Sequence, residues 1–573
     1  MLSSYGMYSM RHIFLCAGLA LTCLLAGAPA SAVDTQLPNM GSSAGTIASP
    51  EEQRQYGFYV LHEMRNQSMV LDDALLTDYL NTLGYRLVAY SPKPDQAFTF
   101  FVVRDTAINA FALPGGFVGV NAGLITTTTS ESELAAVLAH EISHVTQQHL
   151  VRAVEAEQKY APLMVLAMVG AIVASSHQSP GSTSNSDIGA IATAQGLMQQ
   201  MQINFTRADE SEADRIGIQT LARANFDPDA MAGFFERMQR ALRPGFDEND
   251  VPALLMDHPV TLQRISEAKA RAVSVKKEES QRHPALTGSS ASAVLPLLTL
   301  PPGVTASSSA MTAALARPSE SSEQQRVRAE NYYELMRERT RVLASERPTQ
   351  TLAYYQSNSS DGTAHQYGEV LALVRAGEAA KAREAASKLA AAHSDQLVLQ
   401  LALGHAELMS GARDAALKRY TALETEFPDN RALLLAHAEA LLQGGDKTSG
   451  KIAQELLHSK ITDTEEDPDM YIMFGRACEL AGDPVRAGEA HAAAAYLNGR
   501  AEDALNQLKD LSKRRELDYY QRARIDARIA ELTPIVLELR RRKIKPADQG
   551  KLALHPKPTV SACRTDTCAA LSF

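Results

Sequence analysis

Two histidines, four residues apart on one predicted helix, constrain this chain more than any other feature. The motif HEISH, His140 to His144, follows an apolar run from Leu134 to Ala139. Ser130, with Glu133 three residues later, has the pattern of a capping box and places the start of the helix there. Residues at i and i+4 share a helix face, so both imidazoles can reach one metal ion, with Glu141 beside it as a candidate general base. The alternative is a chance match on an ordinary amphipathic helix.

An acidic segment downstream supplies a third candidate ligand. Glu210 and Asp214 are again four residues apart, on a helix predicted to end near Asn225. Two histidines and one carboxylate would leave the fourth position of a zinc ion open, as a hydrolytic site requires. Asp214 could accept the second N–H of a ligand histidine and so fix its tautomer. The alternative is a solvated acidic helix face, to which Asp209 and Glu212 would belong.

HExxH followed by ExxxD resembles the pattern of the M48 peptidases. The resemblance extends from Gln53 to about Ala272 and includes the segment Asn109 to Gly116 and the triplet Asp257-His258-Pro259. It implies an α+β zincin-type metallopeptidase domain with one Zn²⁺ per chain and endopeptidase activity. The residues that it implies are the zinc ligands His140, His144 and Glu210, the catalytic base Glu141, Asp214 behind a ligand, and His258 and Arg264 near the oxyanion.

The role of His258 stays open at this point. It precedes Pro259, which suits the first position of a helix running toward Ala272. A histidine brought to the zinc could stabilise the oxyanion, or it could occupy the fourth metal position and hold the enzyme latent. The plainer alternative is that His258 is only the neighbour of a helix cap.

A small sheet is expected beside the motif helix. Alternating residues from Phe98 to Val103, continuing through Asn109 to Leu113, predict one strand, and Gly116 to Asn121 predict a second. In M48 enzymes an edge strand of this sheet resembles a docking rail, since an unpaired edge offers backbone N–H and C=O groups to an extended substrate. The alternative is that Pro114 and the following glycines form only a turn. The expected substrate strand consists of Asn109, Ala110, Phe111, Ala112 and Leu113.

Residues 1–32 have the pattern of a secretory signal peptide. Arg11-His12 precede an apolar segment from Ile13 to Gly27, and Ala30-Ser31-Ala32 form an A-x-A cleavage site. A second apolar run, Leu163 to Ala174, is too short to span a bilayer. It predicts a buried helix or a hydrophobic flap over the site, and a membrane-surface contact is the alternative. The formal net charge of −10 argues against nucleic acid as a partner.

The C-terminal half repeats. Glycines in successive turns, at Gly377, Gly411, Gly445 and Gly482, are 34, 34 and 37 residues apart. A period of 34 residues is the signature of tetratricopeptide repeats, which stack into an all-α solenoid with a concave binding face. The predicted organisation is a metallopeptidase domain over residues 33–275, a Ser/Pro/Ala-rich linker over 276–324, repeats over 325–540 and a tail over 541–573.

An exported M48 protease joined to such repeats resembles a group of Gram-negative periplasmic proteases. The resemblance implies endoproteolysis of misfolded or stalled outer-membrane proteins and a chaperone-like role in their assembly. It also implies docking of the tetratricopeptide repeats on the barrel-assembly machinery. The alternative is a chaperone or adaptor whose metal site is latent most of the time.

Overall fold

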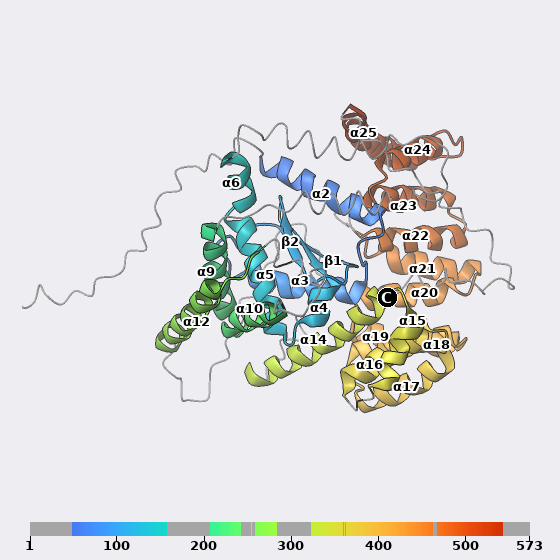
Figure 1. The fold of residues 1–573 in the computed structure, drawn as a ribbon. Coiled ribbons are helices and arrows are strands. Elements are labelled where there is room, and N and C mark those ends of the chain that lie inside the picture. Colours follow the sequence, from blue (N-terminus) through green and yellow to red (C-terminus); the bar gives the residue numbers. More distant parts are fainter. Residues whose placement is uncertain are drawn as a thin grey trace, which may run out of the picture. The chain divides into compact units, whose positions relative to one another are not determined.

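The structure is a computed structural model that describes residues 49–156, 207–241, 254, 258–282, 322–358, 360, 362–461 and 467–541 (Figure 1). The expected signal peptide, the apolar run Leu163 to Ala174 and residues 542–573 lie outside the described residues. Within the described part, no helix is long and apolar enough to cross a membrane.

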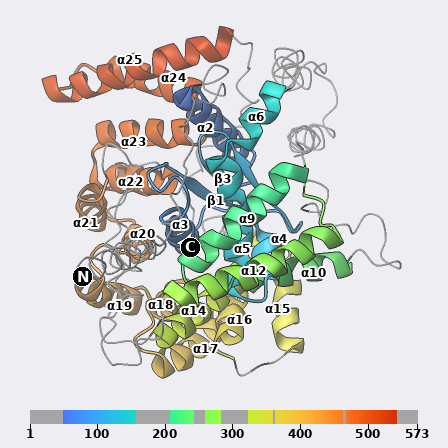
Figure 2. The same cartoon turned by 90° about the vertical axis from the view of Figure 1, so that its left-hand side faces the viewer.

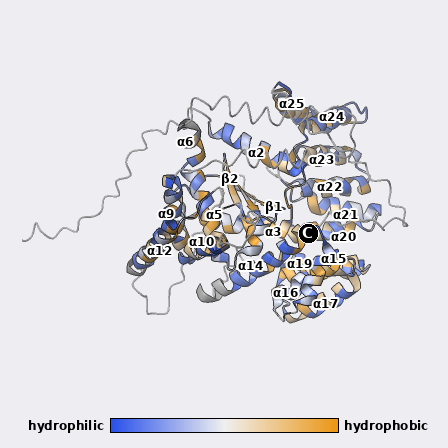
Figure 3. Cartoon of the chain, in the orientation of Figure 1, coloured by the Kyte–Doolittle hydropathy of each residue, from blue (hydrophilic) through white to orange (hydrophobic). Residues whose placement is uncertain are grey.

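The first two helices carry their own start signals. Helix α2 (Pro50–Asn66) begins with a capping box, in which the Ser49 hydroxyl accepts from the Glu52 backbone and the Glu52 side chain accepts from Ser49. Helix α3 (Ala74–Val88) is capped by Asp73, whose carboxylate accepts from the Leu76 N–H. Figure 3 shows the hydrophilic colour along much of α2 and the hydrophobic colour on the sheet below it.

The sheet has three strands in the order β1-β3-β2. Strand β3 (Phe117–Asn121) pairs in parallel with β1 (Thr99–Val103) and antiparallel with β2 (Ala110–Leu113), which is therefore an outer strand. The alternating pattern did not reveal that β1 ends at Val103 and that six residues separate it from β2, which begins at Ala110. The extra strand arises because the chain must turn back to reach the far side of β3.

The motif helix is α5 (Glu131–Thr146), and it begins after Ser130 as the sequence predicts. The Ser130 hydroxyl accepts from the Glu133 N–H, whereas the Glu133 carboxylate accepts from Thr129 rather than completing the capping box. Helix α5 packs against α3, β2 and α9. The neighbouring helices are α4 (Ala122–Thr127), α6 (His149–Ala156), α9 (Arg207–Arg223), α10 (Asp229–Ala241) and α12 (Leu262–Arg282).

Helices α9 and α12 lie side by side, and α9 also packs along α5 (Figure 2). Helix α9 ends close to the predicted Asn225, which adopts φ 60°. Helix α12 starts at Leu262 rather than at Pro259, because the Thr261 hydroxyl accepts the Arg264 N–H and so caps the helix there. It continues to Arg282, and the first residues of the predicted linker are thus helical.

The rest of the described chain is an all-helical repeat array. Gly377, Gly411, Gly445 and Gly482 all have φ between 67° and 84°, and each lies between the two helices of a pair. Such left-handed positions favour glycine, which explains the spacing seen in the sequence. The helices are α14 (Ser322–Ala344), α15 (Pro348–Ser357), α16 (Thr363–Arg375), α17 (Ala379–Ala392), α18 (Leu397–Met409), α19 (Arg413–Glu426), α20 (Arg431–Leu442), α21 (Lys447–His458), α22 (Pro468–Ala481), α23 (Pro484–Leu497), α24 (Ala501–Ser512) and α25 (Tyr519–Arg541).

Helix α14 belongs to both halves of the chain. It packs on α3, α4 and α5 as well as on α16. The Tyr333 hydroxyl donates to the backbone oxygen of Thr128, and the buried Arg339 guanidinium pairs with Asp73. The sequence boundary near residue 325 therefore falls inside a helix that completes the first domain's core.

Candidate metal centre

Helix α5 brings the two motif histidines together. His140 and His144 are buried on the same face, and their Nε2 atoms are 3.0 Å apart. The rings meet edge to face, with centroids separated by 4.6 Å. The i, i+4 spacing has produced the convergence that the sequence predicts.

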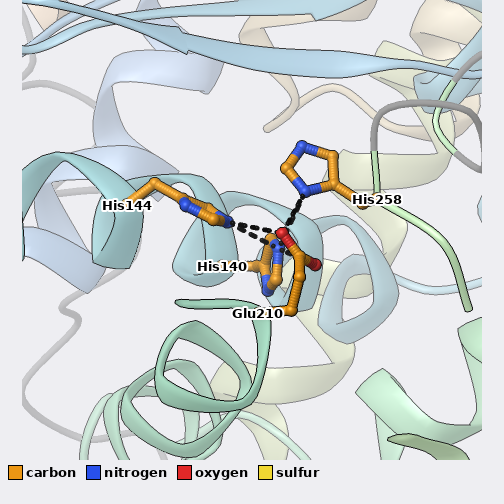
Figure 4. Close-up of side chains that lie close together, drawn as sticks. All are labelled: His140, His144, Glu210 and His258. Atoms are coloured by element: carbon orange, nitrogen blue, oxygen red, sulfur yellow. Dashed lines mark hydrogen bonds and ion pairs between the residues drawn. The ribbon is translucent and has the colours of Figure 1, made fainter. Parts of the chain in front are cut away.

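Helix α9 brings Glu210 to the same point. Its Oε1 lies 3.4 Å from His144 Nε2, and its Oε2 lies 3.5 Å from His140 Nε2. His258 joins them from the segment before α12, with Nδ1 2.8 Å from Glu210 Oε1 and 3.5 Å from His140 Nε2. Figure 4 shows these four side chains turned toward one another. All four are buried, and one donor atom from each lies within 4.8 Å of the others.

His258 is held by the backbone beside the sheet. Its N–H donates to the carbonyl oxygen of Leu254 at 2.8 Å, and the N–H of Leu254 donates to the carbonyl oxygen of Ile108 at 3.1 Å. Ile108 lies two residues before β2. The position of His258 is thus tied to the start of the outer strand.

A buried ion pair lies behind His140. Asp214 Oδ1 is 3.0 Å from His140 Nδ1, and Arg264 donates to both oxygens of Asp214. Arg264 Nη1 also lies 2.7 Å from Glu210 Oε2. Asp214 therefore lies behind His140, a candidate ligand, while Arg264 contacts Asp214 and Glu210 of α9.

Glu141, the one carboxylate of the HEISH motif, is almost fully buried. Its side chain is 1% exposed, and Oε1 lies 3.7 Å from His258 Nε2. It follows His140 on α5, so it projects next to the donor atoms rather than among them. That arrangement suits a base that acts on a group held by its neighbours.

The charges of this cluster suit a cation. Burial lowers the pKa of His144 well below its usual range, although the Glu210 carboxylate works against this. Burial also acts on His140, but the carboxylates of Asp214 and Glu210 outweigh it and raise its pKa to about 10. The neighbouring imidazoles in turn hold the pKa of Glu210 well below its usual range despite burial. Two imidazole nitrogens and a carboxylate facing one point fit a divalent metal ion such as zinc.

The outer strand lies against the motif helix. Ala110 to Leu113 form β2, which packs on α5, and Asn109 precedes the strand and accepts from the Asn121 N–H. The Phe111 ring lies over Gly119, where a Cβ atom would come within 2.4 Å of it. The predicted substrate residues are therefore gathered at the edge of the sheet next to the site.

The sequence reasoning missed His149, whose Nδ1 lies 2.9 Å from His144 Nδ1. Asp209 and Glu212, which could have been plain surface residues, face His149 and Arg152. The only local signal was a histidine five residues beyond His144. A periodic pattern does not indicate that the turn before α6 brings His149 back to His144.

The fold and the donor set define a metallopeptidase. Residues 74–272 match the family model of Peptidase family M48. The chain belongs to this family and is a metalloendopeptidase.

Relatives of the chain extend the match to both of its halves. It is 31% identical to the Beta-barrel assembly-enhancing protease of Yersinia pestis over 524 residues, which cover 90% of this chain and 97% of that protein. The protein of the same name from Escherichia coli (strain K12) is 32% identical over 522 residues, or 89% and 93% of the two chains. The mitochondrial metalloendopeptidase OMA1 of Schizosaccharomyces pombe is 33% identical over 165 residues, 29% of this chain and 44% of that one.

Proposed function

We propose that the chain is a zinc endopeptidase of the periplasm that cleaves misfolded or stalled outer-membrane proteins. One observation carries the catalytic part: the buried nitrogens of His140 and His144 and the carboxylate of Glu210 converge beside Glu141. In this proposal the first three residues hold one Zn²⁺ per chain. When bound, the ion would polarise the scissile carbonyl and make a water molecule more acidic.

The chain's own residues would do the rest of the chemistry. Glu141 takes a proton from the attacking water and later delivers it to the leaving amine. Asp214 accepts the Nδ1–H of His140, which leaves Nε2 to face the ion. Arg264 holds Asp214 in that orientation through its two hydrogen bonds. On these contacts, Arg264 acts by positioning the ligands rather than by reaching the oxyanion.

Two roles are available to His258. Its Nδ1 lies among the candidate ligands, 2.8 Å from Glu210 Oε1, which favours a fourth ligand that keeps the enzyme latent. Its Nε2 lies toward Glu141, which suits oxyanion stabilisation once the ring has moved away from Glu210. The latch is the role that the contacts support better.

The outer strand β2 is proposed as the substrate rail. An extended chain could add to the edge of the sheet through its backbone, so recognition would depend little on side chains. That property suits a protease for unfolded proteins. The hydrophobic flap and the membrane-surface contact predicted for Leu163 to Ala174 remain proposals for a part of the chain outside the described residues.

The cellular role is proposed from the relatives and the sequence together. The relatives in Yersinia pestis and Escherichia coli are called beta-barrel assembly-enhancing proteases, and they match nearly the whole chain. The signal-peptide pattern supports export to the periplasm. The helical repeats, with the tetratricopeptide period, would bind the barrel-assembly machinery and support a chaperone-like role in assembly.

A second candidate is a chaperone or adaptor whose metal site is latent most of the time. The position of His258 within the ligand cluster favours it. The two candidates differ in whether the protein cleaves substrates as its main activity or mainly binds them while the metal site stays latent.

Cleavage of casein by the purified mature protein tests the proposal. Wild type is compared with Glu141→Gln and His258→Ala, and zinc content is measured on the same samples. The expected results are about one zinc per chain in all three, loss of cleavage in Glu141→Gln by at least about 100-fold, and faster cleavage in His258→Ala. If zinc binds and none of the three cleaves, the adaptor candidate is favoured. If wild type binds no zinc, the metal proposal is wrong.

A further inference from the structure

His144 contacts two different histidines through its two ring nitrogens. Its Nε2 is 3.0 Å from His140 Nε2, in the candidate metal centre. Its Nδ1 is 2.9 Å from Nδ1 of His149, and the two rings meet nearly at right angles, 82°, with centroids 4.8 Å apart. His149 is thus directly behind a candidate ligand.

The turn between α5 and α6 places His149 there. Helix α5 ends at Thr146, and α6 begins at His149. Between them Gln148 adopts φ 56°, a left-handed conformation that is uncommon for residues other than glycine. The turn brings the His149 side chain back under the last turn of α5, where it has no solvent exposure.

The far nitrogen of His149 is anchored to α9. Its Nε2 lies 3.1 Å from Glu212 Oε2. Arg152 on α6 donates to the same oxygen at 3.2 Å and to Asp209 Oδ1 at 2.6 Å. These contacts join α6 to α9, the helix that also supplies Glu210.

The hydrogen-bond partners along the series Glu212, His149 and His144 indicate which ring nitrogen of each histidine carries a proton. The Glu212 carboxylate beside Arg152 accepts hydrogen bonds, so His149 donates from Nε2. In the tautomer that donates from Nε2, His149 accepts at Nδ1, and this pairing assigns the proton of His144 to its own Nδ1. This leaves the lone pair of His144 on Nε2, which is the atom that faces the metal centre.

We propose that His149 is a positioning residue, which holds His144 in the one tautomer and orientation that can bind the metal through Nε2. The proposal rests on the metal role of His144 proposed above. In this proposal His149 and Arg152 hold His144 in place, as Asp214 and Arg264 hold His140. Each support ends in an α9 carboxylate held by an arginine, Glu212 by Arg152 and Asp214 by Arg264.

A second metal site at His149, Asp209 and Glu212 is the competing interpretation, because these groups also lie close together. The Arg152 guanidinium already contacts both carboxylates. A fixed positive charge in that place opposes a cation. The contacts therefore favour a hydrogen-bonded support over a binding site.

Zinc affinity of the full mature chain, measured by competition with a chelating dye, tests the inference. His149→Ala removes the acceptor, and we expect affinity to fall by about 10- to 100-fold. His149→Asn places an amide oxygen where Nδ1 lies, and affinity should stay near that of wild type. His149→Gln places its amide toward Glu212 instead and should behave as the alanine variant. His437→Ala removes a buried histidine of α20 that pairs with Glu424, and should leave zinc affinity unchanged.

The visible spectrum of the cobalt-substituted protein is the second measurement, since it reports ligand geometry and not activity. The spectrum of His149→Asn should match that of wild type, whereas the spectrum of His149→Gln should differ from it. Wild-type affinity in His149→Ala would overturn the inference, as would equal affinity in the Asn and Gln variants. The Asn and Gln pair decides the question if the alanine variant does not fold. Absence of zinc from wild type would instead contradict the metal centre itself.

Discussion

Arg264 and Asp214 form a two-point ion pair inside the protein. Nε of Arg264 donates to Oδ2 at 2.9 Å, and Nη2 donates to Oδ1 at 2.8 Å. Lysine has no planar fork and cannot reproduce both bonds. We expect Arg264→Lys to weaken zinc binding by about 10- to 100-fold, because Asp214 would no longer be fixed behind His140. Zinc titration with a chelator measures this.

Arg271→Lys is the matched control for this variant. Arg271 is also on α12, and it also contacts α9, donating to the backbone oxygen of Ser211. Its hydrogen bonds go to Ser211 and Glu267 rather than to a candidate ligand, so the zinc affinity of Arg271→Lys should equal that of wild type. Equal affinity in Arg264→Lys and wild type would contradict the positioning role of the guanidinium.

Gly217 lets α9 approach the motif helix closely. A Cβ atom at this position would come within 3.0 Å of Met231 Cε and 3.3 Å of the His140 backbone nitrogen. Gly217→Val should therefore push α9, with Glu210 and Asp214, away from α5. We expect a loss of stability of about 1–3 kcal/mol and weaker zinc binding. Thermal unfolding and zinc content on the same sample measure both.

Gly233 on α10 is the control for Gly217. A Cβ atom there would meet nothing within 4 Å. Gly233→Ala should be neutral or more stable by up to about 1 kcal/mol, because alanine is the better helix former. If Gly217→Val bound zinc as tightly as Gly233→Ala, the close packing of α9 on α5 would not be needed for zinc binding.

Arg339 connects α14 to the first domain through a buried ion pair. It donates to both oxygens of Asp73 at 2.8 and 2.6 Å and to the Tyr367 hydroxyl at 2.9 Å. Arg339→Met would leave the Asp73 charge buried without its partner. The expected cost is about 3–5 kcal/mol in the free energy of unfolding, measured with urea.

Two further variants separate the charge from the packing. Arg337→Met, on the same helix, removes a more exposed arginine beside Glu338 and should cost less than about 1 kcal/mol. Asp73→Asn combined with Arg339→Met removes both charges and should recover part of the loss. A double variant less stable than Arg339→Met alone would show that the buried charge is not the cause.

Local patterns in the sequence located the main parts of the site. Ser130 marked the start of α5, the i, i+4 spacing brought His140 and His144 together, and Glu210 lies beside both. These features depend on one helix at a time or on a charge pattern within one segment. They can be read before any packing is known.

Contacts between distant segments could not be read in this way. His149 contacts His144 across a turn in which Gln148 has a positive φ, and Arg339 reaches Asp73 across 266 residues. The family resemblance implied a place for Arg264 near the oxyanion, but nothing in the sequence indicated its contacts with Asp214 and Glu210. Such positions depend on how helices pack, for which periodicity provides no signal.

Glu131, at the start of α5, makes the fold sensitive to pH. Its carboxylate accepts from the Tyr79 hydroxyl, and its N–H donates to the Glu330 carboxylate on α14. Burial raises the pKa of Glu131 to about 7, with the charge of Glu330 adding to this and Arg86 and Tyr79 opposing it. The folded chain therefore holds this proton more tightly than the unfolded chain. Its contribution to stability is complete below the ordinary pKa of 4.5 and is lost as pH rises toward 7.

Glu131→Gln mimics the protonated side chain and should lose this dependence. Relative to wild type, the variant should gain on the order of 3 kcal/mol in unfolding free energy between about pH 4.5 and pH 8. Urea unfolding with a chelator in every sample measures the difference without a contribution from bound metal. Glu51→Gln changes an exposed glutamate in the first turn of α2 and should follow the wild-type pH dependence. If the difference in unfolding free energy between Glu131→Gln and wild type stayed constant over this range, folding would not raise the pKa of Glu131.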